Sequence, residues 1–266
     1  MNKILEIENL VKRFGDNYAV KNVSFSVNEG EVLAIIGSSG SGKSTVLRCI
    51  NQLEKIDGGN IKICGEPMIK EIKTANKLPK KYNKKNNKVI YVDKEILNKM
   101  NLECGMVFQN FNLFPHLSVL ENVTEAMIHV LKKSKEEAEK EGIKILTRMG
   151  LEAKINQYPC NLSGGEQQRA SIARTLAINP KIIFMDEPTS ALDPELVGEV
   201  LKVVKQLASE KRTMVIVTHE ISFAREIADR VIFMSNGEII EQGKPEEVID
   251  NPKKERTKEF LKRYLK

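Results

Sequence analysis

The chain has 266 residues, of which 41% are hydrophobic, and it carries a formal net charge of +6. This length and apolar content suffice for one large domain or two packed subdomains, which excludes a disordered chain. The longest apolar runs cover about five residues, at 32–36 and 182–185, so we expect no segment that crosses a membrane, which takes about 20.

The amino-terminal residues contain no apolar signal core, because Glu6 and Glu8 interrupt it. We therefore expect the chain to stay in the cytosol. The cysteines are scattered, with no C-x-x-C pair and no histidine at metal-ligand spacing. This pattern predicts reduced thiols rather than a zinc site or a disulfide framework.

Short apolar segments alternate with helical patterns along the chain. Val23, Phe25 and Val27 alternate with polar residues and predict a half-exposed strand, which a buried strand follows at 32–36. Two further buried strands are predicted at 181–185 and 214–218. This alternation is typical of an α/β fold with a parallel sheet and helices on both faces.

A lysine-rich segment at 66–101 holds ten lysines and four acidic residues, and so accounts for the whole excess of positive charge. Such a segment can be a patch for nucleic acid or anionic lipid. Only Tyr82 and Tyr91 are available for stacking, and no nucleic-acid motif is present, which favours a solvated surface insertion. Pro79 and a run of asparagines predict a loop, and we expect no nucleic-acid partner.

The middle of the chain is predicted to be helical. Ser118 with Glu121, and Ser134 with Glu137, have the spacing of capping boxes at two helix starts. The first helix is expected to place its apolar residues on one side: Val119, Leu120, Val123, Met127, Val130 and Leu131. We therefore expect a helical subdomain at 110–178, inserted into the sheet core.

The sheet core itself is expected at 1–109 and 179–250. Asp193 followed by Pro194 predicts the start of a helix in its second part. The later Asn236-Gly237 pair predicts a hairpin turn, and a helical tail is expected at 251–266.

The strongest motif follows the buried strand at 32–36 and precedes a helical pattern. It satisfies G-x-x-x-x-G-K-[ST] with Gly37, Ser38, Ser39, Gly40, Ser41, Gly42, Lys43, Ser44 and Thr45. The glycines let successive N–H groups point at phosphate oxygens, and the helix start adds positive potential. Lys43 is predicted to reach the outer phosphates and Ser44 to ligate Mg²⁺.

Two carboxylates, Asp186 and Glu187, stand at the end of the strand at 181–185. Strand ends of open α/β sheets are where ligands bind. We therefore assign Asp186 to magnesium and Glu187 to activation of the attacking water.

These motifs occur in many nucleotide hydrolases, and the segment 162–169, LSGGEQQR, discriminates among them. Ser163, Gly164 and Gly165 predict a second helix start that binds an anion but has no lysine. With this segment the chain resembles the ATPases of ABC transporters over nearly its whole length. Many members have glutamine where this chain has Glu166, and a carboxylate there is expected to weaken ATP binding slightly by repulsion.

The resemblance implies a P-loop, RecA-like core with a mixed-sheet amino-terminal part and an inserted helical signature subdomain. It implies that Gln109 senses magnesium and water and lies near a membrane permease. It further implies that His219 contacts the terminal phosphate, that Phe14 stacks on adenine, and that residues 190–193 communicate across a dimer. His116 and His129 are given no role.

The single phosphate loop and single signature imply paired copies, because residues 163–166 of one subunit would cover the ATP of the other. The segments 108–123 and 252–265 resemble importers of polar amino acids, so an ATPase at the cytoplasmic membrane face is expected, working with permease and solute-binding protein. An exporter, an importer of another solute, a soluble ABC ATPase and an unrelated kinase remain alternatives. The kinase leaves Ser163-Gly164-Gly165 unexplained.

Overall fold

The computed structural model describes residues 2–73 and 88–262, and the chain divides into two compact units. The first unit comprises residues 1–103 and 215–266, and the second comprises residues 104–214. In the part of the chain that the structure describes, none of the helices has the length and apolar character needed to cross a membrane.

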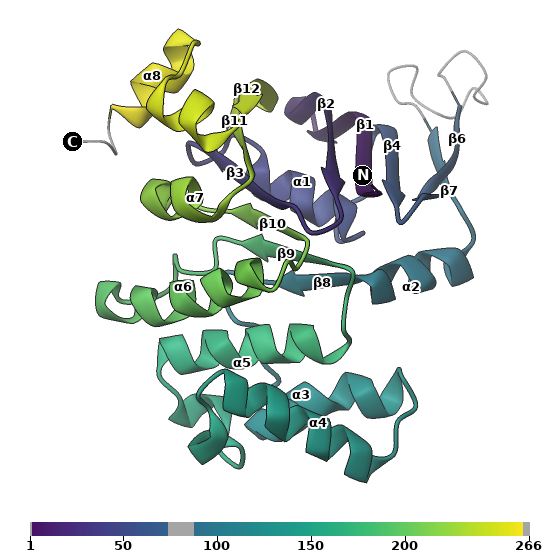
Figure 1. Ribbon diagram of the computed structural model, residues 1–266. Coiled ribbons are helices and arrows are strands. Elements are labelled where there is room, and N and C mark those ends of the chain that lie inside the picture. Colours follow the sequence, from purple (N-terminus) through teal and green to yellow (C-terminus); the bar gives the residue numbers. More distant parts are fainter. Residues whose placement is uncertain (1, 74–87, 263–266) are drawn as a thin grey trace. The chain divides into compact units, whose positions relative to one another are not determined.

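The first unit begins with an antiparallel sheet whose strands lie in the order β2-β1-β4-β5. β1, β2 and β4 run side by side in purple and blue (Figure 1). Val23, Phe25 and Val27 are buried while Ser24 is exposed, which confirms the predicted alternation. The strands are β1 (Lys3–Phe14), β2 (Asn17–Asn28), β4 (Gly58–Ile63) and β5 (Glu66–Pro67).

A second set of strands in this unit follows the order β12-β11-β3-β10. β3 (Val32–Gly37) is buried at every position, as its unbroken apolar run predicts. β11 (Arg230–Ser235) lies parallel to β3 and antiparallel to β12 (Glu238–Gly243), so the sheet is mixed. β10 is Met214–Val217, and the helices are α1 (Lys43–Ile50), α7 (Ile221–Ile227), a π-helical turn η4 (Glu246–Asp250) and α8 (Glu255–Leu261).

The tail of the chain packs against these strands rather than standing apart. Phe260 of α8 contacts Phe233 of β11, with ring centroids 5.0 Å apart, within a buried apolar cluster. The predicted hairpin turn joins β11 to β12, and both Asn236 and Gly237 have positive φ, as such a two-residue turn requires. Residues 263–266 lie outside the described residues.

The second unit contains two parallel strands, β8 (Cys104–Val107) and β9 (Ile182–Asp186), and several helices. The predicted capping boxes at Ser118 and Ser134 are both present. α3, α4 and α5 fall within 110–178, while β8, β9 and α6 complete the unit. The helices are α3 (Val119–His129), α4 (Lys135–Arg148), η2 (Glu152–Lys154), η3 (Pro159–Asn161), α5 (Gly164–Ala177) and α6 (Pro194–Ser209).

Val130 does not lie on the buried side of α3, contrary to the sequence prediction, because it is the capping residue at the end of the helix and is 52% exposed. The start of α6 follows the prediction in part. Asp193 precedes Pro194 at the cap position, but its side chain makes no capping hydrogen bond.

The lysine-rich segment is not a loop throughout, which corrects the sequence prediction. β6 (Ile69–Lys73) pairs with β7 (Lys88–Tyr91), and α2 (Lys94–Glu103) follows. Met68 and Met100 are buried, and the hydroxyl of Tyr91 accepts a hydrogen bond from the N–H of Ile56 at 2.8 Å. A few apolar residues therefore fix both ends of the segment. Pro79 and Tyr82 lie outside the described residues.

Candidate nucleotide-binding site

The predicted site residues divide between the two units. Phe14, the loop at 37–45 and His219 belong to the first unit. Gln109, the segment 163–166 and the carboxylates Asp186 and Glu187 belong to the second. Within the described ranges, no three His, Cys, Asp or Glu side chains cluster as a ready metal site.

The phosphate loop connects the end of β3 to the start of α1 and depends on glycine at two close approaches. Gly37 has φ of 151° and a Cβ atom there would clash with the carbonyl oxygen of Met234. Gly42 has φ of 99° and caps α1, and a Cβ atom there would clash with the carbonyl oxygen of Ala19. A side chain at either position would displace the loop, so the sequence pattern has a steric cause.

Lys43 is 4% exposed, and its ammonium donates to the carbonyl oxygens of Gly37 at 2.9 Å and Ser38 at 3.1 Å. The lysine thus lies across the loop that its own helix follows. The hydroxyl of Ser41 is buried, and among the described residues it has no hydrogen-bond partner. An unpaired buried hydroxyl in this loop fits a phosphate oxygen as the missing partner.

The hairpin turn at Asn236-Gly237 supports this loop, which the sequence alone did not indicate. The N–H of Gly237 donates to the carbonyl oxygen of Ser41 at 3.1 Å. Its own carbonyl oxygen accepts from the N–H of Lys21 in β2 at 2.8 Å. One turn residue therefore links the phosphate loop to the strand that pairs with β1.

Phe14 and His219 both stand at strand ends in the first unit. Phe14 ends β1 and is 49% exposed, with the ammonium of Lys12 over its ring. Thr218 follows β10, and its N–H donates at 3.3 Å to the carbonyl oxygen of Ile35. Because Ile35 lies two residues before the phosphate loop begins, half-buried His219 is placed beside that end of β3.

In the second unit, Asp186 is the last residue of β9 and Glu187 follows it in a left-handed conformation with φ of 47°. A long side chain in this region costs about 1–3 kcal/mol, and such strain concentrates at functional sites. The carbonyl oxygen of Glu187 accepts from the N–H of Ser190 at 3.1 Å and from its hydroxyl at 3.0 Å. This turn holds the strained backbone in place.

Ser163 caps α5 through a complete capping box with Glu166. The N–H of Ser163 donates to the Glu166 carboxylate at 2.8 Å, and the ammonium of Lys154 lies 3.3 Å from its other oxygen. Partial burial raises the pKa of this carboxyl, but the Ser163 N–H and Lys154 outweigh it and the pKa falls below its usual value. The charge expected to repel ATP thus has a counter-charge beside it.

The loop that carries exposed Gln109 is fastened to α5, the helix that begins at the signature. Gln168 donates to the carbonyl oxygen of Phe108 at 3.3 Å, and Arg174 donates to that of Asn112 at 2.7 Å. Gln109 and Ser163 are therefore joined through one helix within this unit.

Asn122 fixes the far end of this loop, and sequence reasoning missed it. Its side-chain amide is fully buried and donates to the carbonyl oxygens of Phe114, Leu117 and Ser118 at 3.0–3.1 Å. Its own oxygen accepts from the N–H of Phe114 at 2.8 Å. The sequence did contain a signal for this role, because an asparagine on the apolar face of a helix needs buried hydrogen-bond partners.

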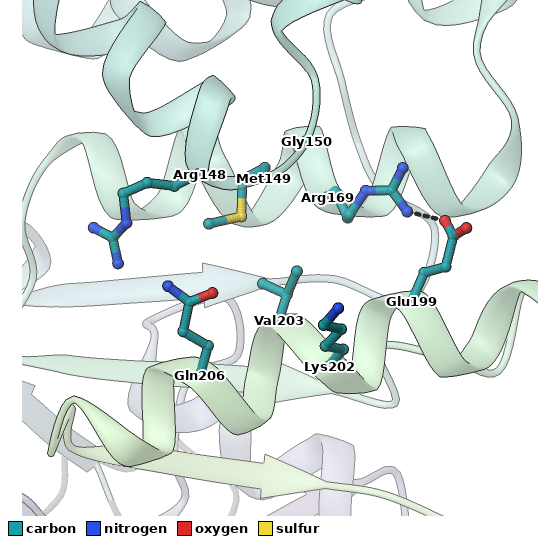
Figure 2. A pocket seen from close by; sticks show the side chains of 8 residues that line it. All are labelled: Arg148, Met149, Gly150, Arg169, Glu199, Lys202, Val203 and Gln206. Atoms are coloured by element: carbon teal, nitrogen blue, oxygen red, sulfur yellow. Dashed lines mark hydrogen bonds and ion pairs between the residues drawn. The ribbon is translucent and has the colours of Figure 1, made fainter.

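A cavity of about 350 Å³ lies elsewhere in the second unit and contains none of the predicted site residues. Figure 2 shows Arg169 of α5 paired with Glu199 of α6, and Met149 and Val203 facing each other between the helices. The remaining lining residues are Arg148, Gly150, Lys202 and Gln206. Both arginines of the lining are paired with glutamates, Arg148 with Glu210 and Arg169 with Glu199, so we do not assign this cleft to the nucleotide site.

Known proteins that are similar to this chain identify its family. The family model described as "ABC transporter" matches residues 20–190. The glutamine transport ATP-binding protein GlnQ of Geobacillus stearothermophilus is 48% identical, with 96% of each chain covered. The histidine/lysine/arginine/ornithine transport ATP-binding protein HisP of Escherichia coli is also 48% identical, with 98% of each covered.

Among solved structures, the dimeric ATP-binding cassette MJ0796 bound to ADP and Pi has a TM-score of 0.74 and 36% identity, covering 91% of this chain and 98% of that one. The chain belongs to the ABC transporter family. It has the P-loop α/β fold predicted from the sequence, and it is an ATP-binding, ATP-hydrolysing subunit of that family.

Proposed function

We propose that this ATPase powers the uptake of a polar amino acid, working as one of two ATP-binding subunits attached to a membrane permease. The position of Glu187 supports the catalytic assignment most directly, because it follows Asp186 at the end of β9, where ligands bind in open α/β sheets, and the turn to Ser190 holds it there. The names of GlnQ and HisP support the substrate class.

The phosphate loop would hold the nucleotide chiefly through groups that are already oriented. Lys43 and the N–H groups of residues 37–45 offset the phosphate charge, and the Ser41 hydroxyl gains the partner it lacks. Thr45 and the serines at 38 and 39 belong to the same loop. Phe14 supplies an aromatic face for the base.

Hydrolysis needs a water molecule that attacks the terminal phosphorus as the bond to the bridging oxygen breaks, giving ADP and inorganic phosphate. Glu187 accepts the proton from that water, a role that contributes about 10²- to 10⁴-fold to rates. His219 contacts the terminal phosphate and keeps it in line for attack.

The oxygen donors in the predicted set suit Mg²⁺, which binds hydroxyl, carboxylate and carbonyl oxygens together with phosphates. Ser44, Asp186 and Gln109 would hold it. When bound, the ion neutralises charge that develops on the phosphate oxygens.

We further propose that Ser163, Gly164, Gly165 and Glu166 of a second copy complete each site in trans. The loop at 108–117 would then transmit the change to the permease, since Gln168 and Arg174 tie it to the same helix. In this arrangement the subunit would lie at the cytoplasmic membrane face. A solute-binding protein outside the membrane would deliver the amino acid.

The test is transport in proteoliposomes that contain the chain, its cognate permease and the solute-binding protein. ATP enclosed with the ATPase inside the vesicles should drive one labelled amino acid among histidine, arginine, glutamine and cystine, supplied outside, to accumulate inside on the ATPase side. Outward-only movement would favour an exporter. ATP hydrolysis unaffected by permease and by every solute would favour a non-transport ATPase.

A further inference from the structure

Lys12 lies against one face of the Phe14 ring, which is assigned to stacking on the base, and the sequence predicts no role for this lysine. Its ammonium is 4.8 Å from the centroid of the Phe14 ring. We propose that Lys12 is a positioning residue for nucleotide binding: it holds the Phe14 ring at a fixed angle and leaves the opposite face open to the base. This proposal rests on the proposed function, because it assumes that Phe14 stacks on adenine.

Lys12 is unusually well anchored for a lysine in a surface sheet. It is 8% exposed, and its ammonium donates to the carbonyl oxygen of Lys55 at 2.7 Å. The carboxylate of Glu54 lies 3.3 Å from the same ammonium. Burying a charge is costly unless it is paired, and these two partners supply the pairing. The cation is therefore held in one place, unlike a flexible surface lysine.

The geometry of β1 explains why the ring needs this support. Lys12 and Phe14 are two residues apart in one strand, so their side chains emerge on the same face. Phe14 ends the strand, and Gly15, which follows in a turn with φ of 60°, has no side chain to pack on the ring. Without Lys12 the ring would turn more freely, and binding a base would have to order it.

The cation also changes the ring itself. An ammonium on one face attracts the π electrons toward that face. The opposite face then repels the π electrons of a stacked base less strongly, and offset stacking becomes more favourable. Phe14 is 49% exposed, so half of its surface remains available to a base.

The backbone places this ring relative to the phosphate loop. β1 pairs with β2, with Lys12 opposite Val20 and Phe14 opposite Asn17. Next to Val20, the carbonyl oxygen of Ala19 lies against Gly42 so closely that no Cβ atom fits between them. The hairpin therefore sets the distance between base and phosphates, while Lys12 sets the orientation of the ring.

The decisive experiment compares ADP, which has a base, with pyrophosphate, which has none. Calorimetry on the full chain should show that Lys12→Met weakens ADP binding about three- to tenfold while pyrophosphate binding is unchanged. Lys62→Met removes a half-exposed lysine that pairs with Glu8 on the neighbouring strand, and is the matched control. Unchanged ADP binding, or equal weakening of both ligands, would overturn the proposal.

Phe14→Ala separates this proposal from the one on which it rests. If Phe14→Ala leaves ADP binding unchanged, base stacking by Phe14 is wrong and the proposal for Lys12 falls with it. If Phe14→Ala weakens ADP binding and Lys12→Met does not, only the role of Lys12 is wrong. In the Phe14→Ala background, Lys12→Met should have no further effect on ADP.

A second pair of variants guards against misfolding of Lys12→Met. Glu54→Gln weakens the anchor but keeps the lysine, and should also weaken ADP and spare pyrophosphate. The chain contains no tryptophan, so Phe14→Trp introduces a single reporter. Its steady-state anisotropy without nucleotide should fall when Glu54→Gln is added, and an unchanged anisotropy would show that the anchored lysine does not order the ring.

Discussion

The ammonium of Lys154 lies 3.3 Å from the carboxylate of Glu166, inside the segment that begins the signature helix. The same carboxylate accepts from the N–H of Ser163 at 2.8 Å. A negative charge at this point would face the phosphates of a partner's nucleotide. The pair thus gives a physical reason why this chain tolerates glutamate in its signature.

Removing Lys154 should expose that charge. We expect Lys154→Met, in a Glu187→Gln background that retains ATP, to weaken ATP-dependent dimerisation about two- to fivefold, the range for a partly exposed pair. Adding Glu166→Gln should restore it. Sedimentation at two salt concentrations is the measurement, and Lys135→Met, which removes an exposed pair with Glu139 on α4, is the control. If the variant that combines Glu187→Gln, Lys154→Met and Glu166→Gln dimerises as weakly as the one without Glu166→Gln, the charge explanation is contradicted.

Glu187→Gln should leave ATP binding intact and slow hydrolysis by about 10²- to 10⁴-fold, because the amide cannot accept the proton from water. With Mg-ATP the variant should elute as a dimer in gel filtration. Adding Ser163→Arg should return it to monomer by blocking the contact in trans. Hydrolysis at the normal rate would remove Glu187 from catalysis, and a monomer that binds ATP would contradict completion in trans.

The backbone at Glu187 allows a further test. Asparagine tolerates positive φ better than a longer side chain does, so Glu187→Asn should raise the free energy of unfolding by up to about 1 kcal/mol relative to Glu187→Gln. Both variants should be inactive. Urea denaturation compares them, and equal stability would show that the strain lies elsewhere.

Gly237→Ala should weaken the phosphate loop from outside it. A Cβ atom there lies 2.9 Å from the carbonyl oxygen of Ala19, at φ of 82°, so we expect a loss of stability of about 1–2 kcal/mol and a higher KM for ATP. Gly198→Ala, in α6 with nothing within 4 Å of the added atom, is the opposite case and should stabilise by about 0.5–1 kcal/mol. If stability falls while the KM for ATP is unchanged, Gly237 contributes to folding and not to nucleotide binding.

The lysine-rich segment can be shortened at a point that the strand pairing defines. Lys73 pairs with Lys88 across β6 and β7, so an Asn-Gly turn can replace residues 74–87 without moving either strand. We expect the ATPase rate to stay within about threefold, because residues 74–87 contain none of the predicted site residues. Loss of activity in a folded protein would give the segment a catalytic role.

Local patterns account for what could be predicted from sequence. The boxes at Ser118 and Ser134 and the turn at Asn236 act over three or four residues, and each forms as expected. The phosphate loop was equally recognisable. Its glycines lie so close to neighbouring carbonyl oxygens that a Cβ atom would clash, so the loop requires glycine at these positions. The separate assignments of site residues to catalysis and metal remain predictions.

Contacts across long stretches of sequence could not be predicted. The ends of the lysine-rich segment are ordered because Met68 donates to Ile61 and accepts from Val92, pairings that composition does not reveal. Lys12 finds its partner 43 residues away at Lys55, so its alternating position in a strand gave no sign of burial. Its position beneath Phe14 follows from folding alone.

Lys43 offers a last consequence, concerning the energy with which nucleotide binds. Its ammonium already donates to the carbonyl oxygens of Gly37 and Ser38, so the lysine holds the loop in one conformation before nucleotide binds. The loop loses its conformational entropy when the chain folds, so ordering the loop reduces the free energy of nucleotide binding only a little. Lys43→Ala should therefore make the loop disordered in the absence of any ligand, visible as faster amide exchange at residues 37–42.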